Sequence, residues 1–254
     1  MRQMRDTADF GYLELVTDRL REVESTQASA IARAARLMAD AVEQDRLIHI
    51  YAGGGHTTLV MGEMFFRAGG LCNVNPLMET GLSVFNQALK YLELERCVNY
   101  GGAIVKYYNL QPGDVLLIFH NVGVNPATID AAMEASRAGA KIVAISSGFW
   151  QALPGDSPIR HPSGANLFDF AEVCIDDLNP VGDAEIRLEE GMPPMAPTSN
   201  LVDFYIAHRL ELATAAECLR RGVGAPVWHS ANAENGDEYN RKYLDHYFNR
   251  VKCL

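Results

Sequence analysis

The sequence has no excess of basic residues. Its 254 residues include 22 Lys and Arg against 32 Asp and Glu, which gives a formal net charge of −10. This balance argues against non-specific binding to nucleic acid and against binding to an anionic membrane surface. A local anion site stays open, because backbone N–H groups can bind phosphate without help from Lys or Arg.

Long apolar runs and metal-binding cysteine motifs are also missing. No signal peptide and no apolar run of 18 or more residues is found, so we expect a cytoplasmic protein without a membrane segment. The five cysteines are scattered, with no CxxC pair and no Cys/His pair at metal spacing. This pattern predicts reduced, mostly buried thiols and no metal site.

The most informative stretch runs from Leu47 to Leu71 and reads LIHIYAGGGHTTLVMGEMFFRAGGL. A short apolar run typical of a buried strand comes first, then Gly53–Gly55, then apolar residues at helical spacing. In a strand, glycine turn and helix, free N–H groups at the helix N-terminus point at a bound anion. The alternative is a tight connection without a ligand, because the turn matches neither the P-loop nor the full GxGxxG pattern.

One continuous helical region is predicted over residues 84–100. Two further strands are predicted, over residues 115–119 and 141–145, with a helix over 127–138 between them. Strands that alternate with helices predict a parallel sheet covered on both faces. Ligands of such sheets lie at the carboxyl ends of the strands. These strand ends carry GGGHTT, HNVGVN and SSG, which are small or polar residues. The three ends together predict one ligand site.

Several strings, in chain order, resemble the sugar isomerase (SIS) domain family: GGGHTT with EMFFRAGGL, VNPLME, QPGDVLLIFHNVGVNP, RHPSG, VGDAE, PTSN and SANAENGDEYNR. The resemblance covers nearly the whole chain and is closest to a bacterial subgroup labelled phosphoheptose-isomerase-like. It implies an α/β fold, a three-layer α/β/α sandwich around a five-stranded parallel sheet. We expect a helical arm over residues 1–44, the SIS domain over 45–223, and a polar tail over 224–254 that packs on the site or on the partner subunit.

The same resemblance implies phosphosugar binding at the carboxyl strand ends, at an interface of a homodimer or homotetramer. Its three site segments correspond to the loop from Gly53 to Thr58, the turn from His120 to Gly123, and the serines that follow the next strand. The substrate-binding residues implied in this way are Gly54, Gly55, Thr57, Thr58, Asn121, Gly123, Ser146, Ser147, Thr198 and Ser199.

The phosphate-binding segments depart from the family pattern. The usual first-loop serine is Gly54, the two turn serines are His120 and Val122, and an arginine frequent in the subgroup is Val124. Neutral hydrogen bonds contribute roughly 0.5–1.5 kcal/mol each and those to charged groups roughly 1.5–3 kcal/mol. Losing three hydroxyls should weaken phosphate binding by orders of magnitude, unless a protonated His120 replaces them. A re-tuned phosphate site, a ligand without phosphate and a decayed site stay open.

Four residues are the candidate acid–base groups. Aldose–ketose isomerisation moves a proton between adjacent carbons through an enediol, which needs a carboxylate or similar base and a second acid or base. Glu63 and Glu79 are the candidate bases, and His56 and His120 are their candidate partners. A helix through both His56 and Glu63 would place them on one face. The alternatives for the two carboxylates are an ion pair of Glu63 with Arg67 at i+4 and a solvated loop position for Glu79.

The predicted function is a sugar or sugar-phosphate isomerase that acts by enediol proton transfer. Two alternatives share the fold: a non-catalytic phosphosugar-binding or regulatory SIS protein, and an amino-sugar-phosphate lyase or deaminase. Fold alone does not decide between them. We predict no cofactor and no nucleic-acid partner.

Overall fold

The computed structural model describes residues 10–254. At its centre lies a five-stranded sheet in the order β2-β1-β3-β4-β5, and every pairing in it is parallel. The strands are β1 (Ile48–Ala52), β2 (Val74–Pro76), β3 (Val115–Phe119), β4 (Lys141–Ser146) and β5 (Val173–Asp176). The predicted α/β fold with a five-stranded parallel sheet is confirmed.

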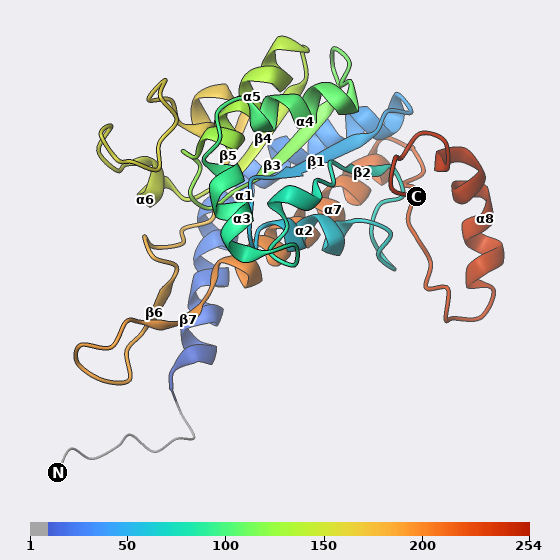
Figure 1. Ribbon diagram of the computed structural model, residues 1–254. Coiled ribbons are helices and arrows are strands. Elements are labelled where there is room, and N and C mark those ends of the chain that lie inside the picture. The colour runs from blue at the N-terminus through green and yellow to red at the C-terminus, as the bar shows by residue number, and fades with distance from the viewer. Residues whose placement is uncertain (1–9) are drawn as a thin grey trace.

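Helices cover both faces of the sheet, which makes three layers (Figure 1). One face packs against α1 (Tyr12–Glu43), α2 (Thr58–Met64) and α7 (Ser199–Arg220), and the other against α4 (Tyr100–Tyr108) and α5 (Pro126–Arg137). Strands β1 and β3 are buried along their whole length because both of their faces meet helices.

Strands β1 and β3 are neighbours from Ile48↔Val115 to Ala52↔Phe119. The sheet order reverses at this pair, since β2 lies on one side of β1 and β4 lies beyond β3. A ligand crevice is expected where the strand order reverses, outside the carboxyl ends of the strands. The glycine turn follows β1 and His120 follows β3, so both lie at that point.

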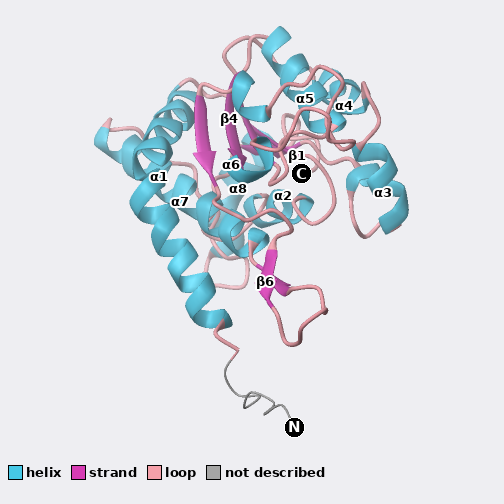
Figure 2. Ribbon diagram, turned by 90° about the vertical axis from the view of Figure 1, so that its left-hand side faces the viewer, coloured by secondary structure: helices cyan, strands magenta, loops and turns pink. Residues whose placement is uncertain are grey.

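The N-terminal arm is one helix of 32 residues. The helix lies in the core from Val23 onward, through residues such as Ile31 and Met38, while its N-terminal part extends beyond the sheet (Figure 2). There it meets the hairpin of β6 (Ala184–Ile186) and β7 (Met195–Pro197), where the Tyr12 hydroxyl donates a 2.9 Å hydrogen bond to the carbonyl of Pro197.

The C-terminal tail contains one helix, α8 (Gly236–Tyr247), and packs beside α2 and β2. Trp228 is 4% exposed and its ring lies 4.9 Å from that of Phe66. A β-bridge joins Leu71 to Val227, and the Lys252 amide donates to Asn75 Oδ1 at 3.2 Å. Within residues 10–254, no helix is long and apolar enough to cross a membrane.

The shorter elements connect these layers. They are η1 (Thr80–Leu82), α3 (Ala88–Glu95), α6 (Gly148–Gln151) and η2 (Leu167–Phe170). The sequence predicted one continuous helical region from 84 to 100, but α3 and α4 are separate helices. Asn99, with a φ of 71°, precedes α4 and breaks the run.

Adjacent glycines in α4 give a matched test of the packing between α4 and α5. A Cβ on Gly101 would lie 1.7 Å from the Ala127 carbonyl oxygen, whereas one on Gly102 would have its nearest neighbour at 3.6 Å. We expect Gly101→Ala to lower the free energy of unfolding by about 1–3 kcal/mol or more. Gly102→Ala should raise it by up to about 1 kcal/mol, because alanine favours a helix. Guanidinium unfolding measures both, and equal effects would contradict the close packing.

Candidate functional site

The three predicted site segments meet at the carboxyl end of the sheet. The Gly53 amide donates to the Phe119 carbonyl at 3.2 Å, and the His120 amide donates to Ile145 at 3.0 Å. The Ser147 amide donates to the Asn121 carbonyl at 3.0 Å. These bonds hold the glycine turn, the His120 turn and the two serines side by side.

The threonine hydroxyls of the glycine turn donate their hydrogen bonds to backbone carbonyls of the same turn. Thr57 Oγ1 donates to the Gly54 carbonyl at 2.7 Å, and Thr58 Oγ1 donates to Gly55 at 2.6 Å. Gly54 and Gly55 have φ values of 151° and 58°, which L side chains rarely adopt. The two hydroxyls therefore stabilise the turn and are left as acceptors toward a ligand.

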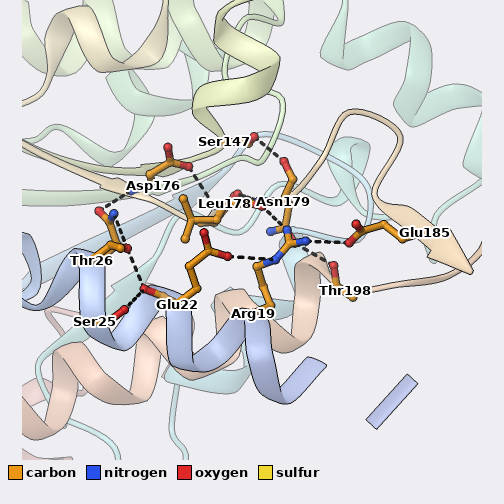
Figure 3. Close-up of polar contacts among 12 residues, drawn as sticks. Arg19, Glu22, Ser25, Thr26, Ser147, Asp176, Leu178, Asn179, Glu185 and Thr198 are labelled. Atoms are coloured by element: carbon orange, nitrogen blue, oxygen red, sulfur yellow. Dashed lines mark hydrogen bonds and ion pairs between the residues drawn. The ribbon is translucent and has the colours of Figure 1, made fainter. Parts of the chain in front are cut away.

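The predicted serines also donate within the chain. Ser146 Oγ donates to the Asn121 carbonyl at 3.2 Å, and Ser147 Oγ donates to the Asn179 carbonyl at 2.6 Å. Thr198 Oγ1 donates to Asn179 Oδ1 at 3.0 Å (Figure 3). In this state the hydroxyls hold the strand-end loops together, and a ligand would have to displace these bonds to receive their protons.

A carboxylate of the chain itself occupies the start of α7. Asp183 Oδ1 accepts from the amides of Thr198 at 3.1 Å and Ser199 at 2.8 Å, while Ser199 Oγ donates to Asp183 Oδ2 at 2.7 Å. The positive end of the helix is thus neutralised from within. This contact links the VGDAE and PTSN strings of the sequence.

His120 is a neutral, buried side chain. It is 4% exposed, and burial lowers its pKa to about 4. Its Nδ1 accepts from the Gly123 amide at 3.2 Å and lies 3.0 Å from Thr128 Oγ1. A protonated His120 therefore does not replace the donors missing from the family pattern.

Glu79 is a local cap. Its Oε1 accepts from the Gly81 amide at 2.7 Å, at the start of η1. Burial first, and the hydrogen bond to Glu79 second, raise the pKa of the Tyr100 hydroxyl to about 12. Glu79 is partly exposed and held in place, which differs from a freely solvated loop carboxylate.

Glu63 pairs with a histidine that sequence reasoning missed. His208 Nε2 on α7 lies 3.1 Å from Glu63 Oε1, and Arg67 Nε lies 3.2 Å from the same oxygen. His56 is exposed and precedes the first residue of α2, so the predicted shared helix face does not exist. The Arg67 ion pair was foreseen, whereas the partner from α7 lies 145 residues along the chain.

A second carboxylate holds the other side of His208. Glu211 Oε2 lies 3.1 Å from His208 Nδ1, and its Oε1 accepts from the Leu71 amide at 3.1 Å. Burial raises the pKa of Glu211, which is 5% exposed. The side chains of His208 and Glu63 are 44% and 22% exposed, so the pair is open to solvent while Glu211 anchors it from below. In the sequence, this cluster is indicated only by the i,i+3 spacing of His208 and Glu211, which places both residues on one face of a helix.

Glu95 is the second residue that sequence reasoning missed. This half-buried carboxylate ends α3 and lies against the glycine turn, where a Cβ on Gly54 would come within 2.6 Å of Glu95 Oε2. The Asn125 Nδ2 donates to Glu95 Oε1 at 3.2 Å. Burial raises the pKa of Glu95 to about 7, and the nearby Arg96 opposes this shift.

Asn121 bridges two buried carboxyl groups. Its Nδ2 donates to Asp177 Oδ2 at 2.7 Å and to Asp203 Oδ2 at 3.2 Å. Burial raises the pKa of Asp177 to about 7, and burial together with the charge of Asp177 raises the pKa of Asp203 well above its ordinary value. Among residues 10–254, the His, Cys, Asp and Glu side chains form no group suited to a metal ion.

The raised pKa values of Asp177 and Asp203 predict that the stability of the fold depends on pH. Because the folded-state pKa values lie above the unfolded value of about 3.9, the folded state binds more protons, and stability falls as pH rises from about 4 to 7. Asp203→Asn keeps an acceptor for Asn121 but cannot ionise. The free energy of unfolding of this variant should therefore exceed that of the wild type by a margin that grows from about pH 4 to pH 7. Urea unfolding at several pH values measures it, with exposed Asp156→Asn as the control. Parallel curves for wild type and Asp203→Asn would contradict the pair.

The comparisons with known proteins agree with the resemblance seen in the sequence. A family model described as SIS domain matches residues 11–147. The chain is 31% identical over 246 residues to the UPF0309 protein of Caldanaerobacter subterraneus subsp. tengcongensis, covering 96% of this chain and 98% of that protein. It is 32% identical over 247 residues to the UPF0309 protein of Thermoanaerobacter pseudethanolicus, with the same coverage of 96% and 98%.

Solved structures share the fold. The phosphoheptose isomerase of Neisseria gonorrhoeae superposes with a TM-score of 0.52 at 14% identity, covering 81% of this chain and 96% of that one. A phosphoheptose isomerase of Francisella tularensis gives a TM-score of 0.51 at 16% identity, covering 81% and 95%. From the family model and the full-length relatives, the chain belongs to the UPF0309 family of SIS domain proteins.

Proposed function

We propose that this protein is a sugar or sugar-phosphate isomerase that acts by enediol proton transfer. The observation that carries the proposal is the contact of 3.1 Å between Glu63 Oε1 and His208 Nε2, two partly exposed acid–base groups at the surface of one α/β domain. General acid–base catalysis needs such a pair within reach of one substrate. The fold shared with phosphoheptose isomerases supports the same reaction class.

In this proposal Glu63 is the base and His208 its partner. Glu63 takes the proton from the carbon next to the carbonyl and returns it to the neighbouring carbon. His208 moves a proton between the two substrate oxygens, so that no net proton is gained or lost. Glu211 orients the His208 ring through its contact with Nδ1. Because Glu211 is itself fixed by the Leu71 amide, the ring has one preferred orientation.

The position of Glu63 relative to the glycine turn fits an extended sugar. Glu63 lies five residues after Thr58, the first residue of α2. At 1.5 Å per residue, this places it about 8 Å along the helix from the turn. An open-chain sugar can span that distance, with one end on the turn and its carbonyl end near Glu63.

The proposal also includes a homodimer or homotetramer with the site at the interface. Large apolar side chains are exposed on the projecting half of α1 and on the β6–β7 hairpin, among them Leu13 at 72%, Leu188 at 56% and Met195 at 46%. Such apolar groups favour contact with another chain. We expect light scattering to give an oligomer, and Leu13→Glu to shift it toward monomer. Leu219→Glu, at a residue 71% exposed on α7, is the control. A monomeric wild type would contradict the proposed homodimer or homotetramer.

The acid–base roles are tested by solvent deuterium incorporation next to the carbonyl, followed by NMR over a panel of free and phosphorylated aldoses and ketoses. Glu63→Gln and His208→Asn should each lower the exchange rate by about 100-fold or more, since general acid–base groups contribute 10²–10⁴-fold. Glu93→Gln, at an exposed position on α3 away from the pair, is the control and should retain activity.

Glu79→Gln separates the two carboxylates that the sequence offered as bases. Loss of exchange in Glu79→Gln with full activity in Glu63→Gln would move the base to η1. Exchange that survives in Glu63→Gln, His208→Asn and Glu79→Gln alike would reject the mechanism.

A further inference from the structure

The surface of the glycine turn is covered by one face of α3. Glu95 and Tyr91 lie four residues apart on this helix, and they face Gly54 and Gly55 respectively. A Cβ on Gly55 would come within 2.9 Å of the Tyr91 ring. The turn therefore meets a carboxylate and an aromatic ring where a phosphate-binding turn needs donors or cations.

Two hydrogen-bond acceptors face this place, and one of them is buried without a partner in the described part of the chain. Asn125 is 3% exposed, and its Nδ2 faces the Glu95 carboxylate because a carboxylate can only accept from it. This orientation leaves Asn125 Oδ1 buried without a partner in the described part of the chain. Glu95 Oε1 receives the Asn125 amide, and Oε2 faces Gly54. A buried acceptor without a partner is costly, so a ligand that donates hydrogen bonds is favoured here.

Apart from the Tyr91 hydroxyl beside Gly55 and the backbone amides of the turn itself, the described surroundings add few donors that a phosphate could use at low cost. His120 is neutral, and the hydroxyls of Thr57 and Thr58 donate to backbone carbonyls of the turn itself. Arg96 is the cation whose charge acts on Glu95 and Tyr91. A phosphate dianion brings acceptors and negative charge to a place that already holds acceptors and a carboxylate.

We propose that the ligand group on the glycine turn is an unphosphorylated, hydroxyl-bearing end of a sugar, which donates hydrogen bonds to Glu95 and Asn125. This inference rests on the proposed sugar isomerase function and narrows its substrate class to sugars without a phosphate at that end. Glu95 contacts the substrate in this arrangement and determines specificity. The reacting carbons remain at Glu63 and His208.

The experiment compares matched pairs of sugars by isothermal titration calorimetry. The probes are D-ribose with ribose 5-phosphate, D-glucose with glucose 6-phosphate, and inorganic phosphate alone. Each is titrated into wild-type protein, Glu95→Gln and Glu93→Gln. Glu93 is an exposed glutamate on the same helix, so its variant removes the same charge away from the turn.

We expect the free sugar of at least one pair to bind the wild type at least 10-fold more tightly than its phosphate. Glu95→Gln should weaken the free sugar and strengthen the phosphorylated member or inorganic phosphate, changing the preference by 10-fold or more. Glu93→Gln should retain the wild-type preference. A wild type that prefers the phosphorylated member, equal behaviour of the two variants, or no binding by any probe would each overturn the inference.

The outcomes separate this inference from the proposed function. Deuterium exchange on phosphorylated sugars alone would support the isomerase and reject the role of Glu95. Binding of free sugars that depends on Glu95, without exchange in any sugar of the panel, would support the inference and reject the isomerase.

Discussion

The close contact between the glycine turn and the His120 turn is the constraint on which the rest of the site depends. A Cβ on Gly53 would lie 2.0 Å from Thr128 Oγ1 and 2.7 Å from the His120 ring, so no side chain fits between them. The parallel register of β1 and β3 sets this distance, and burial then removes the charge of His120. A turn packed in this way cannot use His120 as a cation. Its chemistry must come from the elements that lie over it.

Those elements bring carboxylates. Glu95 comes from α3, and the pair of Asp177 and Asp203 comes from the loop after β5 and from α7. Asp183 neutralises the start of α7 with its own charge. The carboxyl end of the sheet thus has acceptors in excess, and the serine and threonine hydroxyls are bound within the chain. This distribution favours a ligand rich in hydroxyl groups over one rich in negative charge.

The sequence was sufficient to predict the sheet, but it was not sufficient to predict the contacts of Glu63 with His208 and of Glu95 with Gly54. Strands such as β1 and β3 are short apolar runs between polar turns, and this pattern is local, so their positions and the meeting of their carboxyl ends could be predicted. The contact of Glu63 with His208 joins residues that are 145 apart, and it depends on how α7 lies against α2. The contact of Glu95 with Gly54 depends on where α3 ends, and the sequence predicted one helix there instead of two. Neither pairing leaves a periodic signal.

The hydroxyls illustrate a different limit. A serine or threonine after a strand is compatible with ligand binding and with a bond to the nearest backbone carbonyl, since one hydroxyl has a single proton to donate. Thr57, Thr58, Ser146 and Ser147 each give that proton to a carbonyl of the strand-end loops. The same bonds fix the positions of the loops from which Asn121 and Asn125 extend. Where hydroxyls stabilise the scaffold in this way, recognition shifts to the side chains that the scaffold holds, and here these are carboxylates, amides and one histidine.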